Sequence, residues 1–111
     1  MIFVTGPLGA GKQTCICRVL GWSEAEFAQR AIRDVQDMAA EAEDLAALAD
    51  RLSEFSVVLS TEVGGGVVPV DRSERERREK AGRLACLLAQ RAETVIRVQC
   101  GLPQILKGKL P

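Results

Sequence analysis

A lysine that follows a pair of spaced glycines is the first feature of this chain that could do chemistry. Four residues separate Gly6 from Gly11, and Lys12 follows directly. A glycine-rich turn lets successive backbone N–H groups point at phosphate oxygens, and the positive end of a following helix strengthens that attraction. A lysine ammonium adds a point charge for the β- and γ-phosphates. The spacing predicts a phosphate-binding loop. Its expected contacts come from Gly6, Pro7, Leu8, Gly9, Ala10, Gly11, Lys12, Gln13 and Thr14.

The residue after the lysine departs from the usual pattern. That position normally holds a serine or threonine whose hydroxyl binds Mg²⁺, and here it holds Gln13. Thr14 comes one place later and points about 100° away around a helix, so it cannot simply take over the role. Phosphate binding is therefore better supported than catalysis. An ordinary glycine turn is the alternative interpretation.

The elements around the loop fit the phosphate-binding interpretation. An apolar run at residues 2–5 predicts a buried strand before Gly6. The apolar pattern then resumes at Cys15, Ile16, Val19 and Leu20, which predicts a helix that ends near Gly21. A strand, a glycine loop and a helix in this order form the context that a phosphate loop requires.

A second group of candidate residues surrounds Glu62. Residues 56–61 form an unbroken, β-branched run that predicts another buried parallel strand, and glycines occupy positions 64–66. In parallel α/β sheets ligands collect outside the carboxyl ends of the strands. Glu62 would lie beside the phosphate loop if the two strands are neighbours, where it could hold Mg²⁺ through water or accept a proton. A plain loop or cap residue is the alternative.

The remaining segments are expected to serve as scaffold. Residues 23–26 form a capping box, and a stripe of apolar residues from Phe27 to Leu52 predicts one long helix or two consecutive helices. This stripe suits packing against the sheet or against another subunit. Another helix is expected from Asp71 to about residue 92, followed by a third strand at residues 94–99 and a short tail after the turn at 101–103.

Length and composition bound the class of protein. The 111 residues predict a single domain over 1–111, and 47% hydrophobic with 27% charged residues is typical of a soluble globular protein. No apolar run approaches the roughly 20 residues of a membrane span, and no signal peptide is recognised. The four cysteines include no C-x-x-C pair. We therefore expect reduced, mostly buried cysteines in a cytoplasmic protein.

The charge pattern argues against nucleic acid as a partner. The formal net charge is zero. The most basic segment, residues 71–83, interleaves both signs of charge and carries no aromatic residue for base stacking.

The segment from residue 60 to 83 connects the chain to a known family. It reads Ser-Thr-Glu-Val-Gly-Gly-Gly-Val-Val-Pro-Val-Asp-Arg and ends in Arg-Glu-Lys-Ala-Gly-Arg. It resembles the Asn-Glu-Val-Gly loop, hydrophobic pair, proline, arginine and Arg-Asp-x-x-Gly helix of the adenosylcobinamide kinase/adenosylcobinamide-phosphate guanylyltransferases. The matching residues are Glu62, Val63, Gly64, Gly66, Pro69, Arg72, Arg78 and Gly82, whereas Thr61 replaces the asparagine and Glu79 the aspartate. Residues 1–22 and 56–108 thus resemble the two ends of that family.

The resemblance implies a P-loop NTPase-like α/β fold with a small parallel sheet flanked by helices. It also implies ATP or GTP with Mg²⁺, a corrinoid substrate, and homo-oligomers, with trimers as the expected form. Lys12 would hold phosphates, and Glu62 would assist the metal or the acceptor hydroxyl. The chain departs from the family at Gly9, where an arginine is usual, at Gln13, and in its middle. There the family has a histidine that becomes guanylylated and a second strand that ends in an acid, whereas this chain has no histidine.

Two functions follow as expectations. The leading one is nucleoside-triphosphate binding with adenosylcobinamide kinase-like phosphoryl transfer in cobalamin biosynthesis, without the histidine-dependent guanylyl step. The alternative is a non-catalytic nucleotide-binding or interaction subunit derived from the same fold.

Overall fold

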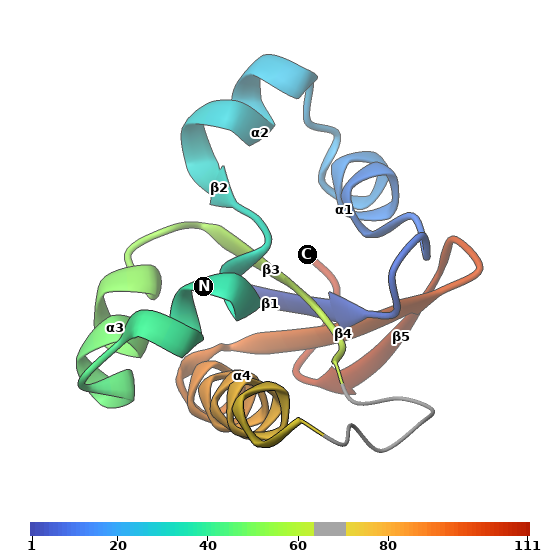
Figure 1. Cartoon of the computed structure of the whole chain (residues 1–111). Helices are drawn as coiled ribbons and strands as arrows, with labels where there is room; N and C mark the ends of the chain where they lie inside the picture. The colour runs from blue at the N-terminus through green and yellow to red at the C-terminus, as the bar shows by residue number, and fades with distance from the viewer. Residues whose placement is uncertain (64–70) are drawn as a thin grey trace.

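The chain forms a five-stranded sheet flanked by helices (Figure 1). A computed structural model describes residues 1–63 and 71–111. The glycines expected at 64–66 and the proline at 69 lie outside the described residues. In chain order the elements are β1 (Ile2–Gly6), α1 (Lys12–Leu20), α2 (Glu24–Arg30), β2 (Ala31–Ile32), the 3₁₀ helix η1 (Val35–Glu41), α3 (Leu45–Leu52), β3 (Val57–Thr61), α4 (Arg72–Arg91), β4 (Thr94–Gln99) and β5 (Leu102–Lys107).

The strands lie in the order β2-β3-β1-β4-β5. The three strands expected from the sequence form its centre, where β1 pairs in parallel with β3 on one side and β4 on the other. β1 and β3 sit between two helical layers, which explains their continuous apolar runs. The short tail expected after Gly101 is wrong, because residues 102–107 form the antiparallel edge strand β5 on β4.

Two apolar layers sandwich the sheet. On one face α3, α4 and η1 pack against the sheet around Phe3, Val58 and Leu84. On the other face α1 and α2 cover Val4 and Leu59. Figure 1 shows α1 and α2 on one side of the sheet and α3 and α4 on the other. Both layers leave the carboxyl ends of β1 and β3 at the same edge, which is where the loop before α1 begins.

The expectation of one long helix or two consecutive helices along the stripe from Phe27 to Leu52 is wrong. The segment breaks into α2, the two-residue strand β2, η1 and α3. The first part of its apolar stripe, Phe27, packs with α1, whereas Val35 and Leu52 pack with α4 on the opposite face. A helical spacing of apolar residues therefore arises from a segment that passes around the sheet edge. Backbone pairing of β2 with β3 and the need to cover both faces override the local pattern.

The helix expected after residue 71 is confirmed. Asp71 is its N-cap, and its carboxylate accepts a hydrogen bond of 2.8 Å from Ser73 N–H. Leu84 and Leu88 are buried and Leu87 is partly buried, as expected. No helix in the described parts of the chain is long and apolar enough to cross a membrane.

The cysteines only partly follow the expectation. All four are free. Cys15 is buried and Cys17 is half-buried, but Cys86 and Cys100 are exposed, so the prediction of mostly buried thiols is wrong. Cys86 lies on a solvent-facing position of α4, and Cys100 lies in the β4–β5 turn.

Candidate functional site

A glycine loop joins β1 to α1 and leaves the helix N-terminus open. Gly9 and Gly11 adopt φ values of 74° and 81°, a left-handed conformation that favours glycine. Gly11 is the N-cap of α1, and no side chain of the described residues caps that helix. The first N–H groups of a helix have no intrahelical partner. Residues 11–14 at this end of α1 line a cavity of about 240 Å³ together with the rest of the loop and with Leu59 and Thr61 of β3.

Lys12 lies folded against its own loop. Its Nζ donates hydrogen bonds to the carbonyl oxygens of Gly6 at 3.2 Å and Pro7 at 2.9 Å. Partial burial lowers the pKa of Lys12 below its ordinary value, while the carboxylates of Asp34 and Glu62 act in the opposite direction. The ammonium is thus held against the carbonyl oxygens of the loop, with two acids close enough to influence its pKa.

The turn between β4 and β5 supports the loop from the far side. Gly101 N–H donates to the carbonyl of Ala10 at 2.8 Å, and Arg18 of α1 donates to the carbonyl of Gly101 at 3.2 Å. Gly101, in the turn that precedes β5, is therefore hydrogen-bonded both to the loop and to α1.

Glu62 lies at the carboxyl end of β3, beside the loop, as the sequence predicts. Its backbone N–H donates to the carbonyl of Gly6 at 2.9 Å. Its carboxylate makes a bidentate contact with Arg97 of β4, from Nε to Oε1 at 2.6 Å and from Nη2 to Oε2 at 3.0 Å. This hydrogen bonding holds the pKa of Glu62 below its ordinary value, against a smaller opposing effect of burial.

Arg97 was missed by sequence reasoning, although a signal was present. It is the lone charged residue of β4 and stands opposite Thr5 of β1. An arginine within an otherwise uncharged strand has to find an anion or water at the strand end. Its guanidinium reaches past the end of β1, where Gly6 carries no side chain.

Asp34 supplies a second acid that the sequence analysis did not find. β2 pairs in parallel with β3, so Arg33 and Asp34 come out at the same edge as Glu62. Asp34 has φ 58°, and it lines the loop cavity together with Arg33. The expectation of a plain helical scaffold over residues 23–54 is therefore wrong here, because a short strand followed by an acid lies within that segment.

The position usually taken by serine or threonine is occupied by a paired side chain. Gln13 Oε1 accepts a hydrogen bond of 2.9 Å from Arg33 Nη1. Arg33 also lies 3.9 Å from Asp34, measured from Nε to Oδ2. Thr14 lines the same cavity from the next helical position. The guanidinium of Arg33 is thus held by Gln13 on the side of the loop where the usual serine or threonine hydroxyl is missing.

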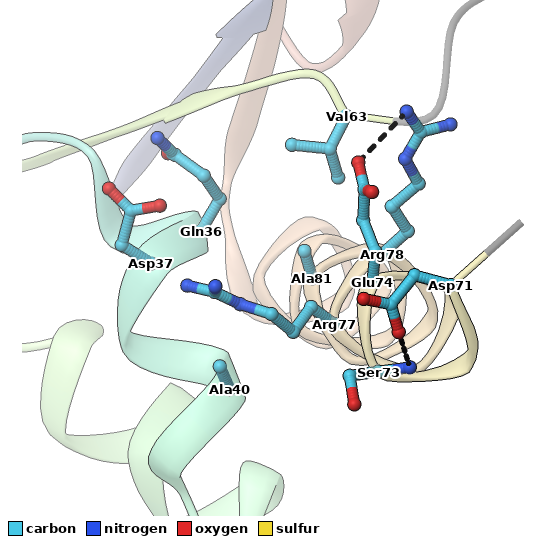
Figure 2. A pocket seen from close by; sticks show the side chains of 10 residues that line it. All are labelled: Gln36, Asp37, Ala40, Val63, Asp71, Ser73, Glu74, Arg77, Arg78 and Ala81. Carbon is cyan, nitrogen blue, oxygen red and sulfur yellow. Dashed lines mark hydrogen bonds and ion pairs between the residues drawn. The ribbon is translucent and has the colours of Figure 1, made fainter. Parts of the chain in front are cut away.

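A larger cavity of about 510 Å³ lies between η1 and α4 (Figure 2). Asp71 is engaged with Ser73, and Glu74 with Arg78 at 3.6 Å. Arg77 reaches across the cavity toward η1. The described lining residues are Gln36, Asp37, Ala40, Val63, Asp71, Ser73, Glu74, Arg77, Arg78 and Ala81.

Comparison with known proteins identifies one family. The model described as "Cobinamide kinase / cobinamide phosphate guanyltransferase" matches residues 10–106. The matched range includes the middle segment that carries β2 and Asp34. A search among curated proteins found no match.

Proposed function

The chain belongs to the cobinamide kinase / cobinamide phosphate guanyltransferase family, and from this premise we propose that it is a P-loop nucleotide-binding kinase. It binds ATP or GTP through residues 6–14 and transfers a phosphoryl group to a cobinamide-type acceptor. The family is one of transferases and implies a role in cobalamin biosynthesis. The observation that carries the proposal is the joining of a glycine loop, Lys12 and an open helix N-terminus around one cavity.

The residues near the loop fit the Mg²⁺ that accompanies a nucleoside triphosphate. Mg²⁺ is usually held by phosphate oxygens, water and one or two carboxylates. Asp34 and Glu62 supply hard oxygen atoms, and both influence the pKa of Lys12. We propose that the carboxylates of Asp34 and Glu62 would hold the metal. Because Arg97 already binds the carboxylate of Glu62, Glu62 would do so through water. Bound Mg²⁺ supplies neutralisation of the charge that develops on the transferred group.

The residue roles follow from positioning rather than from strong acid–base chemistry. Lys12 and the loop amides hold the phosphates. Glu62 has a lowered pKa, which makes it a weak base, so its role in this proposal is to orient the acceptor hydroxyl. Phosphoryl transfer needs little more, because it depends mainly on alignment and charge stabilisation.

The guanylyl step is not part of the proposal. The resemblance assigns that step to a histidine intermediate, and the sequence contains no histidine. The proposed activity is therefore that of the kinase alone.

A non-catalytic nucleotide-binding subunit is the second candidate. It is favoured by the contacts that already occupy Gln13 and Glu62, with Arg33 and Arg97 respectively. Metal-independent nucleotide binding without turnover would support this candidate over the kinase.

Calorimetry with ATP and GTP, with and without Mg²⁺, tests nucleotide binding. Lys12→Ala should weaken binding by about 1.5–3 kcal/mol, roughly 10- to 150-fold, as expected for a lost charged hydrogen bond. Lys109→Ala removes the same charge from the exposed tail and should leave affinity unchanged. Equal affinity of wild type and Lys12→Ala would remove the phosphate-loop assignment. Transfer of labelled phosphate from ATP to cobinamide then separates the kinase from the binder.

A further inference from the structure

We propose that Arg33 contacts the phosphate groups of the bound nucleotide, and that Gln13 positions its guanidinium for this contact. The inference rests on the nucleotide binding proposed for residues 6–14, and it applies to the kinase and to the non-catalytic binder alike. It gives a role to the position after Lys12, where the usual hydroxyl for Mg²⁺ is absent.

The fold brings Arg33 to the phosphate loop from a distant part of the sequence. β2 pairs in parallel with β3, with Ile32 opposite Val58, so the chain leaves β2 toward the edge where the loop begins. Arg33 is the next residue, and it lines the loop cavity together with Lys12 and Thr14. Its side chain is 64% exposed, so the guanidinium is accessible to a ligand in that cavity.

Gln13 holds this guanidinium against the first turn of α1. Its Oε1 accepts the hydrogen bond of 2.9 Å from Arg33 Nη1, between residues that are 20 positions apart. Because Gln13 directly follows Lys12, the contact places the guanidinium beside the helix end whose N–H groups have no intrahelical partner. Asp34 adds a weaker attraction, with 3.9 Å between its Oδ2 and Arg33 Nε. The side chain of Arg33 is therefore oriented toward the loop before any ligand binds.

The guanidinium of Arg33 keeps donors for a ligand. Its Nη1 donates to Gln13, whereas its Nη2 has no hydrogen-bond partner within the described residues. A planar guanidinium can donate to two oxygen atoms of one phosphate, whereas an ammonium acts as a point charge. The ammonium of Lys12 already donates to the carbonyl oxygens of Gly6 and Pro7. Arg33 thus adds open donors to those of the loop amides.

The contact between Gln13 and Arg33 changes how the loop neutralises phosphate charge. A serine or threonine hydroxyl at the position of Gln13 would hold Mg²⁺, and the positive charge would then come from the metal. Here the side-chain oxygen of Gln13 accepts from Arg33, so the positive charge on this side comes from the protein. Loss of Arg33 should therefore weaken phosphate binding most when Mg²⁺ is absent.

Calorimetry of the whole chain with ATP and with inorganic tripolyphosphate, each in EDTA and in excess Mg²⁺, tests the inference. Arg33→Ala should weaken the binding of both probes at least about 10-fold in EDTA, the scale of a lost charged hydrogen bond, and by less in Mg²⁺. Arg33→Lys keeps the charge without the planar fork and should recover part of the affinity. Arg51→Ala removes the same charge from an exposed position of α3 that does not line the cavity, and should leave both affinities unchanged. Circular dichroism and the thermal midpoint show that each variant is folded.

A double-mutant cycle tests the positioning role of Gln13. Gln13→Ala should weaken binding in EDTA, but by less than Arg33→Ala does. The double variant should bind no more weakly than Arg33→Ala alone, because Gln13 acts through Arg33. Losses that simply add would overturn the positioning role.

The outcomes separate this inference from the proposed function. ATP binding that is weakened by Lys12→Ala but not by Arg33→Ala would overturn the role of Arg33 and retain the phosphate loop. An equal loss for Arg33→Ala in EDTA and in Mg²⁺ would overturn its link to the missing hydroxyl. Tripolyphosphate binding that depends on Arg33, without any binding of ATP, would retain the phosphate contact and remove the nucleotide from the proposed function. A wild type that binds neither probe would overturn both.

Discussion

The carboxylate of Glu62, at the end of β3, is held in a bidentate contact by Arg97, which fixes its position beside the phosphate loop. Glu62→Gln keeps the size of the side chain and removes its charge. We predict that the substitution leaves nucleotide affinity nearly intact and lowers the rate of phosphoryl transfer by roughly 10²-fold or more, the scale of losing a group that positions the reactants. Steady-state assays with labelled ATP and cobinamide give both quantities.

Glu93→Gln serves as the matched control, because Glu93 is exposed just before β4 and its side chain faces no cavity described above. Kinase activity that survives Glu62→Gln undiminished would remove Glu62 from the mechanism. It would leave the phosphate loop untouched.

The same ion pair makes stability depend on pH. Arg97 holds the pKa of Glu62 below its ordinary value of 4.5. A carboxylate with a lowered pKa in the folded state contributes stability that is fully present above the ordinary value and is lost as pH falls through the lowered one. The difference in thermal midpoint between wild type and Glu62→Gln should therefore be largest near neutral pH. It should shrink as the pH falls below about 4.5. A difference in thermal midpoint that stays constant from about pH 3 to about pH 7 would contradict a stabilising Glu62–Arg97 ion pair.

Asp34 makes a separate prediction about metal dependence. The negative charge of Asp34 lies near Lys12. It therefore weakens the binding of a nucleotide without metal and strengthens the binding of Mg²⁺ beside the phosphates. Asp34→Asn should raise nucleotide affinity in the absence of Mg²⁺ and reduce the gain in affinity that Mg²⁺ brings. Titrations in EDTA and in excess Mg²⁺ measure the two values. An unchanged metal effect would mean that Asp34 does not reach the cation.

The sequence predicted the backbone of the site better than its side-chain partners. The loop, Lys12 and Glu62 could be located because each follows a continuous apolar strand. Arg33 and Asp34 could not, since they follow a strand of two residues inside a helix-like pattern. Arg97 lies within a strand that was correctly predicted, but its partner is distant in sequence. Long-range ion pairs of this kind leave no local periodicity.

At the scale of elements, the close approach of β1 and β4 depends on Gly6. A Cβ atom built there would fall on the carbonyl oxygen of Val98, and Gly6 has φ 156°. Gly6→Ala should therefore lower the free energy of unfolding by about 2–5 kcal/mol, from backbone strain and overpacking together. Urea denaturation followed by circular dichroism measures the change.

Gly82 provides the contrasting case on α4. A Cβ atom there has open space, and the backbone is helical. Gly82→Ala should raise the free energy of unfolding by about 0.5–1 kcal/mol, because alanine loses less backbone entropy in a helix. Similar effects of the two substitutions would contradict the packing described for β1 and β4.

The errors in the predicted elements share a physical cause. The segment from Glu24 to Leu52 has helical spacing, yet it must pair with an edge strand and cover both faces of the sheet. The sequence predicts a short tail after residues 101–103, because Gly101 and Pro103 indicate a turn there. An edge strand tolerates a proline where no ladder hydrogen bond is needed from it. In both places tertiary pairing outweighs local sequence preference.

At the scale of the whole molecule, the surface expected for self-association changes. The apolar stripe of residues 27–52 or the helix face at residues 84–88 is expected from the sequence to contact another subunit, but Phe27, Leu52, Leu84 and Leu88 of these two surfaces are buried within the chain. Among the described residues, four of the seven large apolar side chains that are exposed lie on or after β5. They are Leu102, Ile105, Leu106 and Leu110, with 68%, 45%, 54% and 38% of their surface accessible.

We therefore predict that the self-association implied by the family resemblance uses β5. An edge strand presents unpaired backbone N–H and C=O groups, and apolar side chains on both of its faces favour pairing with a second copy. Leu106→Lys places a charge in this surface and should lower the molar mass measured by light scattering across micromolar concentrations. Met38→Lys introduces the same charge at an exposed apolar residue of η1 and should leave the mass unchanged. A mass that falls only with Met38→Lys would move the interface to the η1 face, and a wild-type monomer would remove it.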